Sequence, residues 1–538
     1  MRLDTWFLTA AERGNPHTAI DRRREGVEPA APEGWTEGNL VNVLVDGAEY
    51  FGRLHEELCQ LGPDDWVHFT DWEGDPDQRL DGPGTELVVV LCDLVKRGVH
   101  VRGLLWRSHP RQARFSEQEH VRLVKEVNEA GGEVLLDERV RRGGSHHQKL
   151  FLLRRAAGPE RDVAFVGGID LCHSRRDDPR HLGDPQTIEL DPRYGERPPW
   201  HDLQLEVRGP AVGDLAHTFR ERWSDTTPLD HRNPWRWATR LFTHQPRHPD
   251  PLPPVRADPS AAGPHAVQVL RTYPAKRPPY PFAPKGERSI ARAYRKALPR
   301  ARRLVYVEDQ YLWSEDAADT FAEALTRNPE LRLVIVVPRF PERGGQSGKT
   351  EMIGRLRVLD RLYAASHDRV GVYDLENADG VPVYVHSKVC ILDDVWLEIG
   401  SDNLNRRSWT HDSELSCAVI DDTLDEREPR DPAGGGDGAR RFARETRLRL
   451  WREHLGRAEG DDADLVDPVA GFRAWRETAT ALEEWYARGQ SGPRPPGQVR
   501  PHRPEPLPRT AQWWATATHR VFVDPDGRPQ ELRRVGRF

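Results

Sequence analysis

The sequence predicts an α/β fold built as a pseudo-twofold tandem. Its two similar α/β halves each have a mixed, largely parallel sheet flanked by helices, and a functional site lies at their interface. Two observations predict this arrangement. Short apolar runs alternate with amphipathic stretches of helical length, the pattern of strand–helix units. A motif of the first half also returns in the second half, which indicates an internal repeat. The chain has 538 residues, enough for two large units.

Each predicted element rests on its own pattern. The apolar runs predict buried strands at 87–91, 133–136, 304–307 and 333–337. The stretches 115–130 and 288–298 have helical periodicity, and each stands directly before one of these strands. Helix and strand therefore alternate in both halves of the chain.

Breaks in composition predict the domain boundaries. A segment dense in Pro, Asp and Ala reads as a linker, and a second Pro-rich segment sets off the C-terminal tail. In the tail, Trp513-Trp514 and a turn signal at Asp524-Pro525-Asp526-Gly527 predict a hairpin. The predicted units are 1–243, the linker 244–264, the second half 265–460 and a C-terminal extension 461–538.

Composition excludes several classes of protein. The net charge of −7 argues against a broad basic face that coats nucleic acid. No run of about 18 apolar residues exists, so no transmembrane helix is expected, and the N-terminus lacks the pattern of a classical secretion signal. The five cysteines are scattered and form no Cys-x-x-Cys pair, so neither a disulfide scaffold nor a zinc ribbon is expected. A cytoplasmic location is the expectation, with peripheral contact to a membrane as an option.

The repeated motif is a His-x-Lys entering an apolar strand, followed by a second strand that ends in Gly-[Gly/Ser]-x-[Asp/Asn]. With 22 His and 8 Lys in the chain, composition alone would produce about 0.3 His-x-Lys triplets. Two triplets in matching contexts therefore indicate related halves. A further echo joins His201-Asp202 to His411-Asp412. The motif residues are His147-Gln148-Lys149 with Gly167-Gly168-Ile169-Asp170, and His386-Ser387-Lys388 with Gly400-Ser401-Asp402-Asn403.

The spacing of the motif predicts its chemistry. Residues i and i+2 of a strand project on one face, so His147 points with Lys149, and His386 with Lys388. If the halves face each other, two imidazoles and two ammonium groups converge on one pocket. Such a pocket suits a phosphodiester: the lysines hold its oxygens, one histidine attacks phosphorus and the other protonates the leaving oxygen.

Two other residue types bear on this pocket. Trp200 and Trp409 are candidates for its mouth, whereas arginine pairs such as Arg175-Arg176 are expected on solvated faces.

The second motif resembles the signature of the phospholipase D superfamily. It reads His386-x-Lys388-x4-Asp393, followed by Gly400-Ser401-x-Asn403. The segments 199–202 (Pro-Trp-His-Asp) and 306–311 (Tyr-Val-Glu-Asp-Gln-Tyr) look like the phosphatidylcholine-type branch more than the nuclease branch. The resemblance covers roughly residues 40–455, with both signatures in the expected order.

This resemblance implies a metal-independent reaction through a phosphohistidine, with no cofactor. His147 is then the nucleophile, and His386 is the general acid and later the base. Lys149 and Lys388 bind phosphoryl oxygens, and a carboxylate behind each histidine fixes its tautomer. Asp177 and Asp412 are expected in that last role, with Asp178 and Glu414 as near alternatives. The implied substrate-binding residues are Asp170, Asn403, Gly168, Ser401 and Glu414, and Asp393 is a structural residue of the motif.

The first motif departs from the signature at one position. Arg154 stands four residues after Lys149, where the family pattern has Asp. In one interpretation Glu160 or Asp162 returns a carboxylate to the region and the site is intact. In the other, the first half of the site is weakened.

The resemblance implies hydrolysis of glycerophospholipids to phosphatidic acid and a free headgroup alcohol, with transphosphatidylation as a competing outcome. The expected partner is a phospholipid rather than nucleic acid, and the chain is expected to be a monomer without calcium dependence. The alternatives are a cardiolipin-synthase-like phosphatidyltransferase, a nuclease-type phosphodiesterase, and a non-enzymatic scaffold descended from the enzyme.

Overall fold

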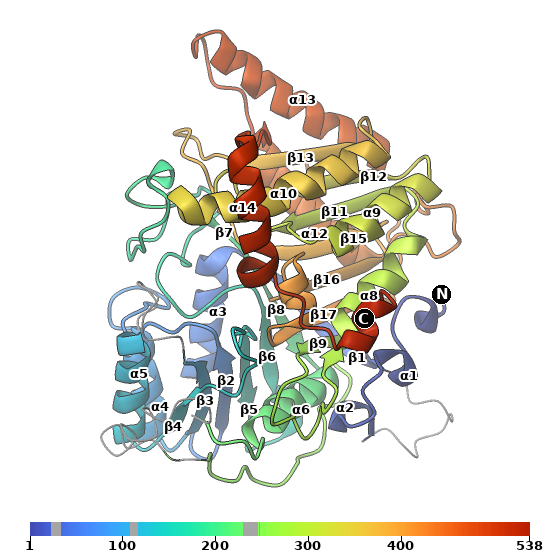
Figure 1. The fold of residues 1–538 in the computed structure, drawn as a ribbon. Coiled ribbons are helices and arrows are strands. Elements are labelled where there is room, and N and C mark those ends of the chain that lie inside the picture. The colour runs from blue at the N-terminus through green and yellow to red at the C-terminus, as the bar shows by residue number, and fades with distance from the viewer. Residues whose placement is uncertain (23–33, 108–116, 230–245, 247) are drawn as a thin grey trace.

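The computed structural model describes the chain except for residues 23–33, 108–116, 230–245 and 247 (Figure 1). The first residues of the predicted linker and of the predicted helix 115–130 fall in these gaps and lie outside the described residues. The predicted domain boundaries remain predictions, whereas the tandem of two α/β halves is plain from the strand order.

The two halves contribute strands to one continuous path in the same order. From the centre outward, the first half contributes β1 (Thr36–Val45), β8 (Leu203–Arg208), β6 (Val163–Gly167), β5 (Leu150–Arg154), β2 (Trp66–Asp71), β3 (His100–Trp106) and β4 (Glu133–Asp137). The second half contributes β9 (His265–Tyr273), β17 (Glu414–Asp421), β16 (Trp396–Gly400), β15 (Lys388–Leu392), β11 (Leu304–Asp309), β12 (Arg332–Val336) and β13 (Val370–Leu375). The first strands of the halves, β1 and β9, pair antiparallel at the centre. This repeated order is the predicted pseudo-twofold.

Four further short strands complete the sheets. β18 (Val499–Pro501) extends the outer edge beside β13, and β10 (Glu287–Arg288) pairs with β9. β7 (Trp200–His201) and β14 (Tyr384–Val385) pair in parallel as a separate ribbon. In that ribbon, β7 of the first half pairs with the two residues that precede His386, the first residue of the second His-x-Lys motif.

The sheet is mixed, as predicted, but the expectation that it is largely parallel needs correction. Parallel pairing joins only β2–β3–β4 in the first half and β11–β12–β13 in the second. The strands nearer the centre pair antiparallel, and β5 with β6 and β15 with β16 form hairpins between neighbouring strands.

Helices cover the outer faces of the sheet and part of the junction between halves (Figure 1). The longer helices are α3 (Asp46–Cys59), α4 (Leu87–Lys96), α5 (Glu117–Glu129), α6 (Ala211–Trp223), α8 (Ser289–Ala297), α9 (Glu315–Arg327), α10 (Gly345–Ala365), α12 (Arg441–Leu455), α13 (Pro468–Ala487) and α14 (Arg509–Thr518). The short ones are α1 (Ala10–Arg13), α2 (Ala19–Arg22), α11 (Arg406–Thr410) and α15 (Gln530–Arg534), with single turns at Leu3–Thr5, Pro159–Arg161, Pro192–Tyr194, Leu298–Arg300 and His519–Val523.

The apolar run 87–91 is helical, so the strand predicted there is wrong. It opens α4, which buries Leu87, Leu91 and Leu94 against the first half of the sheet. A short apolar run has no periodicity that separates a buried strand from a helix, and here the run continues for three helical turns. The other predicted strands and the helix at 288–298 are confirmed as β4, β11, β12 and α8.

The core lies in three main layers. The central cluster joins residues of both halves, including Leu205 on β8 and Ile399 on β16. One outer cluster fills the space between the first half of the sheet and α3, α4 and α5, and the other lies under α8 and α9. Because the central layer is shared, the two sets of motifs are held in a fixed relation.

The predicted C-terminal hairpin is also wrong, because the tail forms α14, a π turn at His519–Val523, and α15. Ala515 packs with Ile353 of α10, but Trp513 is 82% exposed and Phe522 is 73% exposed. Among the described residues, no helix has both the length and the apolar character needed to cross a membrane.

Candidate functional site

The first His-x-Lys motif leads into β5 and is held by the other half of the molecule. The backbone N–H of His147 donates to the carbonyl of Ser413 at 2.9 Å. Nδ1 of His147 lies 2.8 Å from Oε2 of Glu414, at the start of β17. Ser401 donates its hydroxyl to the same carboxylate oxygen at 2.6 Å, so Glu414 is fixed from two sides.

The second motif repeats this geometry with the halves exchanged. The backbone N–H of His386 donates to the carbonyl of His201 at 2.8 Å. Nδ1 of His386 lies 2.6 Å from Oδ2 of Asp202, directly before β8. Each histidine is therefore paired with a carboxylate from the opposite half. With Nδ1–H donated to that carboxylate, Nε2 of each ring is left for chemistry.

The expectation that Asp177 and Asp412 stand behind the histidines is therefore corrected. Asp177 accepts backbone N–H groups of Gly183 and Trp200, each at 2.9 Å, and so stabilises a loop. Asp412 forms an ion pair with Arg407 at 2.8 Å. Of the near alternatives, Asp178 pairs with exposed Arg180, whereas Glu414 does hold His147.

The reason for this error is a slip of two residues in the repeat. Ser413 and His201 occupy equivalent backbone positions, so Glu414 corresponds to Asp202 rather than to a residue near His411. The apolar alternation carried this signal. Leu203, Leu205 and Val207 after Asp202 match Leu415, Cys417 and Val419 after Glu414.

The two motif lysines are buried and have different partners. Lys149 Nζ lies 2.9 Å from Oδ1 of Asp170, at the end of the Gly-Gly-x-Asp segment. Lys388 Nζ donates to Oε1 of Gln310 at 3.2 Å, and burial lowers the pKa of Lys388 to about 8. The residue pattern did not single out Gln310, which comes directly after β11.

The carboxylate of Asp170 interacts electrostatically with residues of both motifs. Burial raises the pKa of this carboxyl, but the charges of Lys149, Arg175 and both motif histidines together hold it below its ordinary value. One carboxylate thus lies within electrostatic reach of His147 and His386. At the matching position of the second half, the buried Oδ1 of Asn403 has no hydrogen-bond partner.

Gly168 and Ser401 lie beside the two carboxylates that hold the histidines. A Cβ on Gly168 would come within 2.2 Å of Oδ1 of Asp202, so only glycine leaves room for that carboxylate. Ser401 bonds Glu414 and also accepts the backbone N–H of Leu415 at 3.0 Å. Their expected contact with substrate stays a prediction, because their present contacts are with protein groups.

Asp393 and Arg154 both lie at the far ends of their strands from the histidines. Asp393 accepts the backbone N–H groups of Arg302, Arg303 and Leu304 at 2.7–2.9 Å. Arg154 forms an ion pair of 2.6 Å with Asp162. Asp162, one of the two residues considered for this purpose, thus supplies the carboxylate of the region, and Arg154 leaves the pocket undisturbed.

Arg175, Trp200 and Trp72 lie beside the motif residues; of these, Trp200 was expected near the pocket, Arg175 was expected on a solvated face, and Trp72 was not singled out. Arg175 is buried rather than solvated: it lies 3.6 Å from Asp170 and packs over Trp200. The ring of Trp200 is 5.0 Å from that of His386, and Trp72 is 5.9 Å from His147. Trp409 is fully buried in the core, so the expectation that it lines the mouth is wrong.

Burial and positive neighbours determine the charge state of His386. Burial first, and then Lys388 and Arg175, lower the pKa of His386 well below its ordinary value. Burial raises the pKa of its partner Asp202 to about 6. Near pH 7 His386 is therefore neutral, with a proton on Nδ1 and a lone pair on Nε2.

Comparison with known proteins covers both halves. The family model described as Phospholipase D matches residues 101–234 and 366–489, and the model described as Cardiolipin synthase, PLD-like domain, matches residues 294–427. A crystal structure of phosphatidylserine synthase from Haemophilus influenzae has the same fold, with a TM-score of 0.50 and 12% identity over 71% of this chain and 82% of that one.

The curated relatives with similar sequences are longer than this chain. Phospholipase D2 of Bos taurus is 25% identical over 86% of this chain and 57% of its own length. Phospholipase D alpha 1 of Arabidopsis thaliana is 25% identical over 63% of this chain and 52% of its own. The chain thus spans little more than half the length of these relatives. Because both halves match family models of phospholipase D type and carry the paired motifs in the expected order, the chain belongs to the phospholipase D superfamily.

Proposed function

We propose that this protein is a phospholipase D-type phosphodiesterase, which hydrolyses glycerophospholipids to phosphatidic acid and a free headgroup alcohol. The observation that supports the proposal best is the exchange of carboxylates: Glu414 holds His147 and Asp202 holds His386, around buried lysines. Two imidazoles whose Nδ1 atoms are occupied have free Nε2 atoms, as nucleophilic and acid–base catalysis at one phosphorus requires.

In the proposed first step, Nε2 of His147 attacks phosphorus and the bond to the headgroup oxygen breaks. His386, protonated at Nε2, gives its proton to that oxygen. His386 is neutral without substrate, but a phosphodiester anion bound beside it favours the protonated ring. The proton that is donated therefore enters with substrate binding.

In the second step, Nε2 of His386 takes a proton from water, and the water oxygen attacks phosphorus. The bond between phosphorus and His147 breaks, which releases phosphatidic acid and restores the free imidazole. Lys149, Lys388 and the amide of Asn403 would hold the phosphoryl oxygens in both steps. An alcohol in place of water would give transphosphatidylation by the same route.

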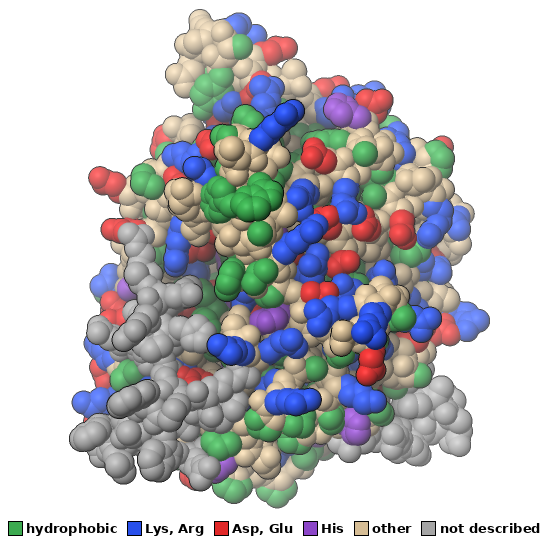
Figure 2. All heavy atoms as spheres, in the orientation of Figure 1, with side chains coloured by type: hydrophobic (Ala, Val, Ile, Leu, Met, Phe, Trp, Pro, Cys, Tyr) green, Lys and Arg blue, Asp and Glu red, His purple; other side chains and the backbone are tan. Residues whose placement is uncertain are grey.

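We further propose that the protein contacts the membrane through a C-terminal apolar patch, formed by Trp513, Val521 and Phe522. These side chains are 60–82% exposed, and Figure 2 shows hydrophobic side chains gathered over α14. Large aromatic groups in this position suit the interface of a bilayer. Such contact would be peripheral, and the five free thiols agree with a cytoplasmic location.

The patch is linked to the site by a short series of contacts. Arg407 donates to the carbonyl of Phe522 at 3.2 Å and pairs with Asp412. Asp412 in turn accepts the backbone N–H of Ser145 at 2.9 Å, in the loop that leads to His147. A lipid that enters from a bilayer under the patch would therefore arrive beside the loop that leads to His147.

One assay tests the function. The protein is incubated with labelled phosphatidylcholine, phosphatidylglycerol and single-stranded DNA, with and without ethanol, beside His147→Ala, His386→Ala and the exposed control His367→Ala. Phosphatidic acid and, with ethanol, phosphatidylethanol formed by wild type and His367→Ala only are the expected result. Cardiolipin as the main product would favour the phosphatidyltransferase, DNA cleavage with unchanged lipids the nuclease, and no product at all the scaffold.

A further inference from the structure

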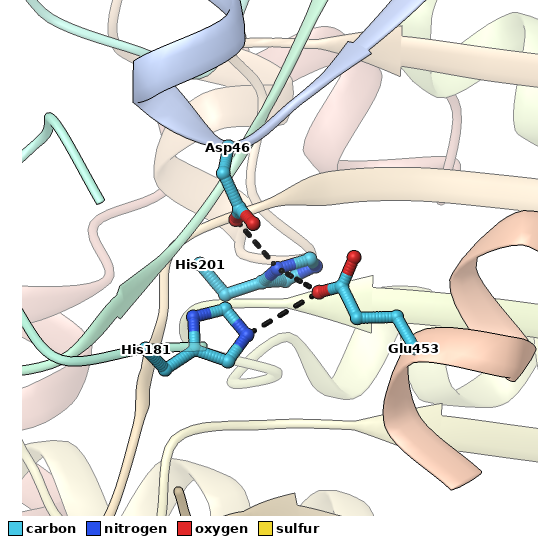
Figure 3. Close-up of side chains that lie close together, drawn as sticks. All are labelled: Asp46, His181, His201 and Glu453. Atoms are coloured by element: carbon cyan, nitrogen blue, oxygen red, sulfur yellow. Dashed lines mark hydrogen bonds and ion pairs between the residues drawn. The ribbon is translucent and has the colours of Figure 1, made fainter. Parts of the chain in front are cut away.

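Four ionisable side chains converge in a second cluster behind His386, apart from the two motifs (Figure 3). Asp46 is the first residue of α3, His201 lies on β7 and Glu453 lies on α12. His181 comes from the loop between β6 and β7. Both histidines are fully buried, Asp46 is 1% exposed and the side chain of Glu453 is 9% exposed. Figure 3 shows all four side chains directed toward one another.

The distances in this cluster fit a single small cation. His201 Nδ1 lies 2.9 Å from Oδ1 of Asp46 and 3.4 Å from Oε1 of Glu453. His181 Nε2 lies 3.3 Å from the same oxygen of Glu453, and one ligand atom from each residue falls within 4.8 Å of all the others. Tetrahedral zinc with bonds of about 2.0–2.1 Å places its ligand atoms about 3.3–3.5 Å apart.

Hydrogen bonds outside the cluster set the tautomers of both histidines. His181 Nδ1 lies 3.1 Å from the carbonyl oxygen of Trp200, and His201 Nε2 lies 3.0 Å from Oε2 of Glu308. Both partners are acceptors, so these nitrogens carry the protons. His181 Nε2 and His201 Nδ1 then face the cluster, the arrangement that holds histidines on metals. His201 Nδ1 here shares a hydrogen bond with Asp46 Oδ1, and a bound ion would replace that contact.

Three polar atoms of the cluster lack a hydrogen-bond partner. Asp46 Oδ2, His181 Nε2 and Glu453 Oε1 are buried and none is aligned in a hydrogen bond, whereas Asp46 Oδ1 is paired with His201 Nδ1. Asp46 also has a φ of 65°, a conformation that is uncommon for a residue with a side chain and that here starts a helix. Buried acceptors gathered at one point need a positive charge among them.

We propose that Asp46, His181, His201 and Glu453 bind one divalent cation, zinc by the preference of this donor set. Two carboxylates neutralise the charge of the ion, and two imidazoles complete a four-coordinate shell. With all four positions filled by protein, the ion is structural and takes no part at phosphorus. The proposal departs from the expectation that the protein holds no metal.

The metal site would position His386 through the peptide bond between His201, a proposed ligand, and Asp202. His201 is followed directly by Asp202, whose carboxylate holds His386 Nδ1. Glu308, which accepts from His201, also accepts the hydroxyl of Ser387 at 2.6 Å, between His386 and Lys388. An ion that anchors β7 to α3 and α12 thus fixes the support of the second motif from behind.

The alternative to a metal ion is protonation of the two histidines. Two imidazolium rings paired with Asp46 and Glu453 would balance the same charges without a metal. A neighbouring group, His201, Glu308 and His454, is a second place for an ion, since His454 Nε2 lies 2.9 Å from Glu308. The experiment therefore needs to separate zinc from protons, and one group from the other.

Metal analysis of the full chain separates these cases. Protein produced with added zinc and passed over a chelating resin is expected to retain about one zinc per chain by mass spectrometry. His181→Gln and Glu453→Gln are expected to lose it. The matched control His454→Gln, also buried beside Glu308, is expected to keep it. X-ray absorption of the wild-type protein is expected to show zinc bound by nitrogen and oxygen at about 2.0–2.1 Å.

Wild-type measurements alone can overturn the proposal, whatever the folding of the variants. Less than a tenth of a zinc per chain, with a melting temperature unchanged by added zinc, would show that protons fill the cluster. Loss of zinc in His454→Gln with retention in His181→Gln would place the ion on the neighbouring group and equally overturn the assignment. Lipid activity enters neither result, so the outcome is independent of the proposed function.

Discussion

The carboxylate of Glu414 lies 2.8 Å from Nδ1 of His147, so the second half of the chain holds the histidine of the first half. The first half returns the same support through Asp202 and His386. Neither half contains a complete pair. The fold therefore needs both halves, joined through a shared core, before either histidine is oriented.

The first prediction concerns these carboxylates. Glu414→Gln and Asp202→Asn keep the shape of each side chain but remove the charge that orients and polarises the imidazole. We expect kcat to fall by about 10- to 100-fold with little change in KM, because each carboxylate bonds the Nδ1 atom of its histidine and acts through that ring. Steady-state kinetics on a soluble short-chain phosphatidylcholine measures both constants.

Asp178→Asn is the matched control for this pair. Asp178 lies close to Asp177 in sequence but bonds only exposed Arg180 and its own loop. Its kcat should stay within about twofold of wild type. If Asp178→Asn lost as much activity as Glu414→Gln, the loss would reflect general damage to the loops and not the orientation of an imidazole.

Local pattern was enough to predict the motif residues but not their supports. His147, Lys149, His386 and Lys388 repeat with identical spacing, and neighbours in a strand share a face whatever the rest of the chain does. The contact between His147 and Glu414 instead joins residues 267 positions apart. It depends on how the halves pack, which periodicity within one segment does not encode.

Two other errors have the same physical origin. The apolar run 87–91 would suit either a buried strand or a buried helix. It is helical because the apolar pattern continues to residue 94 within α4. Arg175 looked solvated beside Arg176, yet the tertiary fold pairs it with Asp170 and Trp200. A buried charge is visible only once its partners from distant segments are known.

The second prediction assigns the nucleophile. In His386→Asn no imidazole remains to activate water, so a phosphatidyl group transferred to His147 should persist. Phosphatidyl-p-nitrophenol is the substrate of choice, because p-nitrophenolate leaves without a proton. Peptide mass spectrometry is expected to find the group on His147, with one burst of p-nitrophenol per chain.

The reciprocal variant supplies the contrary outcome. In His147→Asn, no stable adduct and no burst are expected. The neutral state of His386, which follows from its lowered pKa, also makes that ring a competent nucleophile in the free protein. An adduct on His386 in His147→Asn, with none on His147 in His386→Asn, would exchange the two roles.

The third prediction follows from Lys388, whose pKa burial lowers to about 8. Below that pH the lysine is charged and can bind a phosphoryl oxygen, and above it the charge is lost. We therefore expect kcat/KM to fall as the pH rises through about 8, since this ratio reports the free protein. Measurements on a soluble substrate between about pH 6 and 10 define the limb.

Lys388→Arg is the control for the assignment of this limb. Arginine keeps its charge across the whole range, so the variant should lose the fall near pH 8 even if its overall rate is lower. A wild-type profile that stays flat to about pH 10 would contradict the role given to Lys388. So would an unchanged limb in the variant.

The fourth prediction tests the C-terminal apolar patch. Trp513→Ala and Phe522→Ala each remove a large exposed ring, and we expect binding to phospholipid vesicles to weaken by about tenfold, equivalent to about 1.4 kcal/mol, if the ring enters the bilayer. Val89→Ala, on the exposed face of α4 in the first half, is the control and should bind as wild type does. Sedimentation with vesicles measures the binding, and kcat on a monomeric short-chain lipid should be unchanged in all three variants. The patch is linked to the site through the backbone carbonyl of Phe522, Arg407 and Asp412. A fall in that kcat would therefore mean that the rings support the site from within, whereas unchanged vesicle binding would remove the patch from the membrane contact.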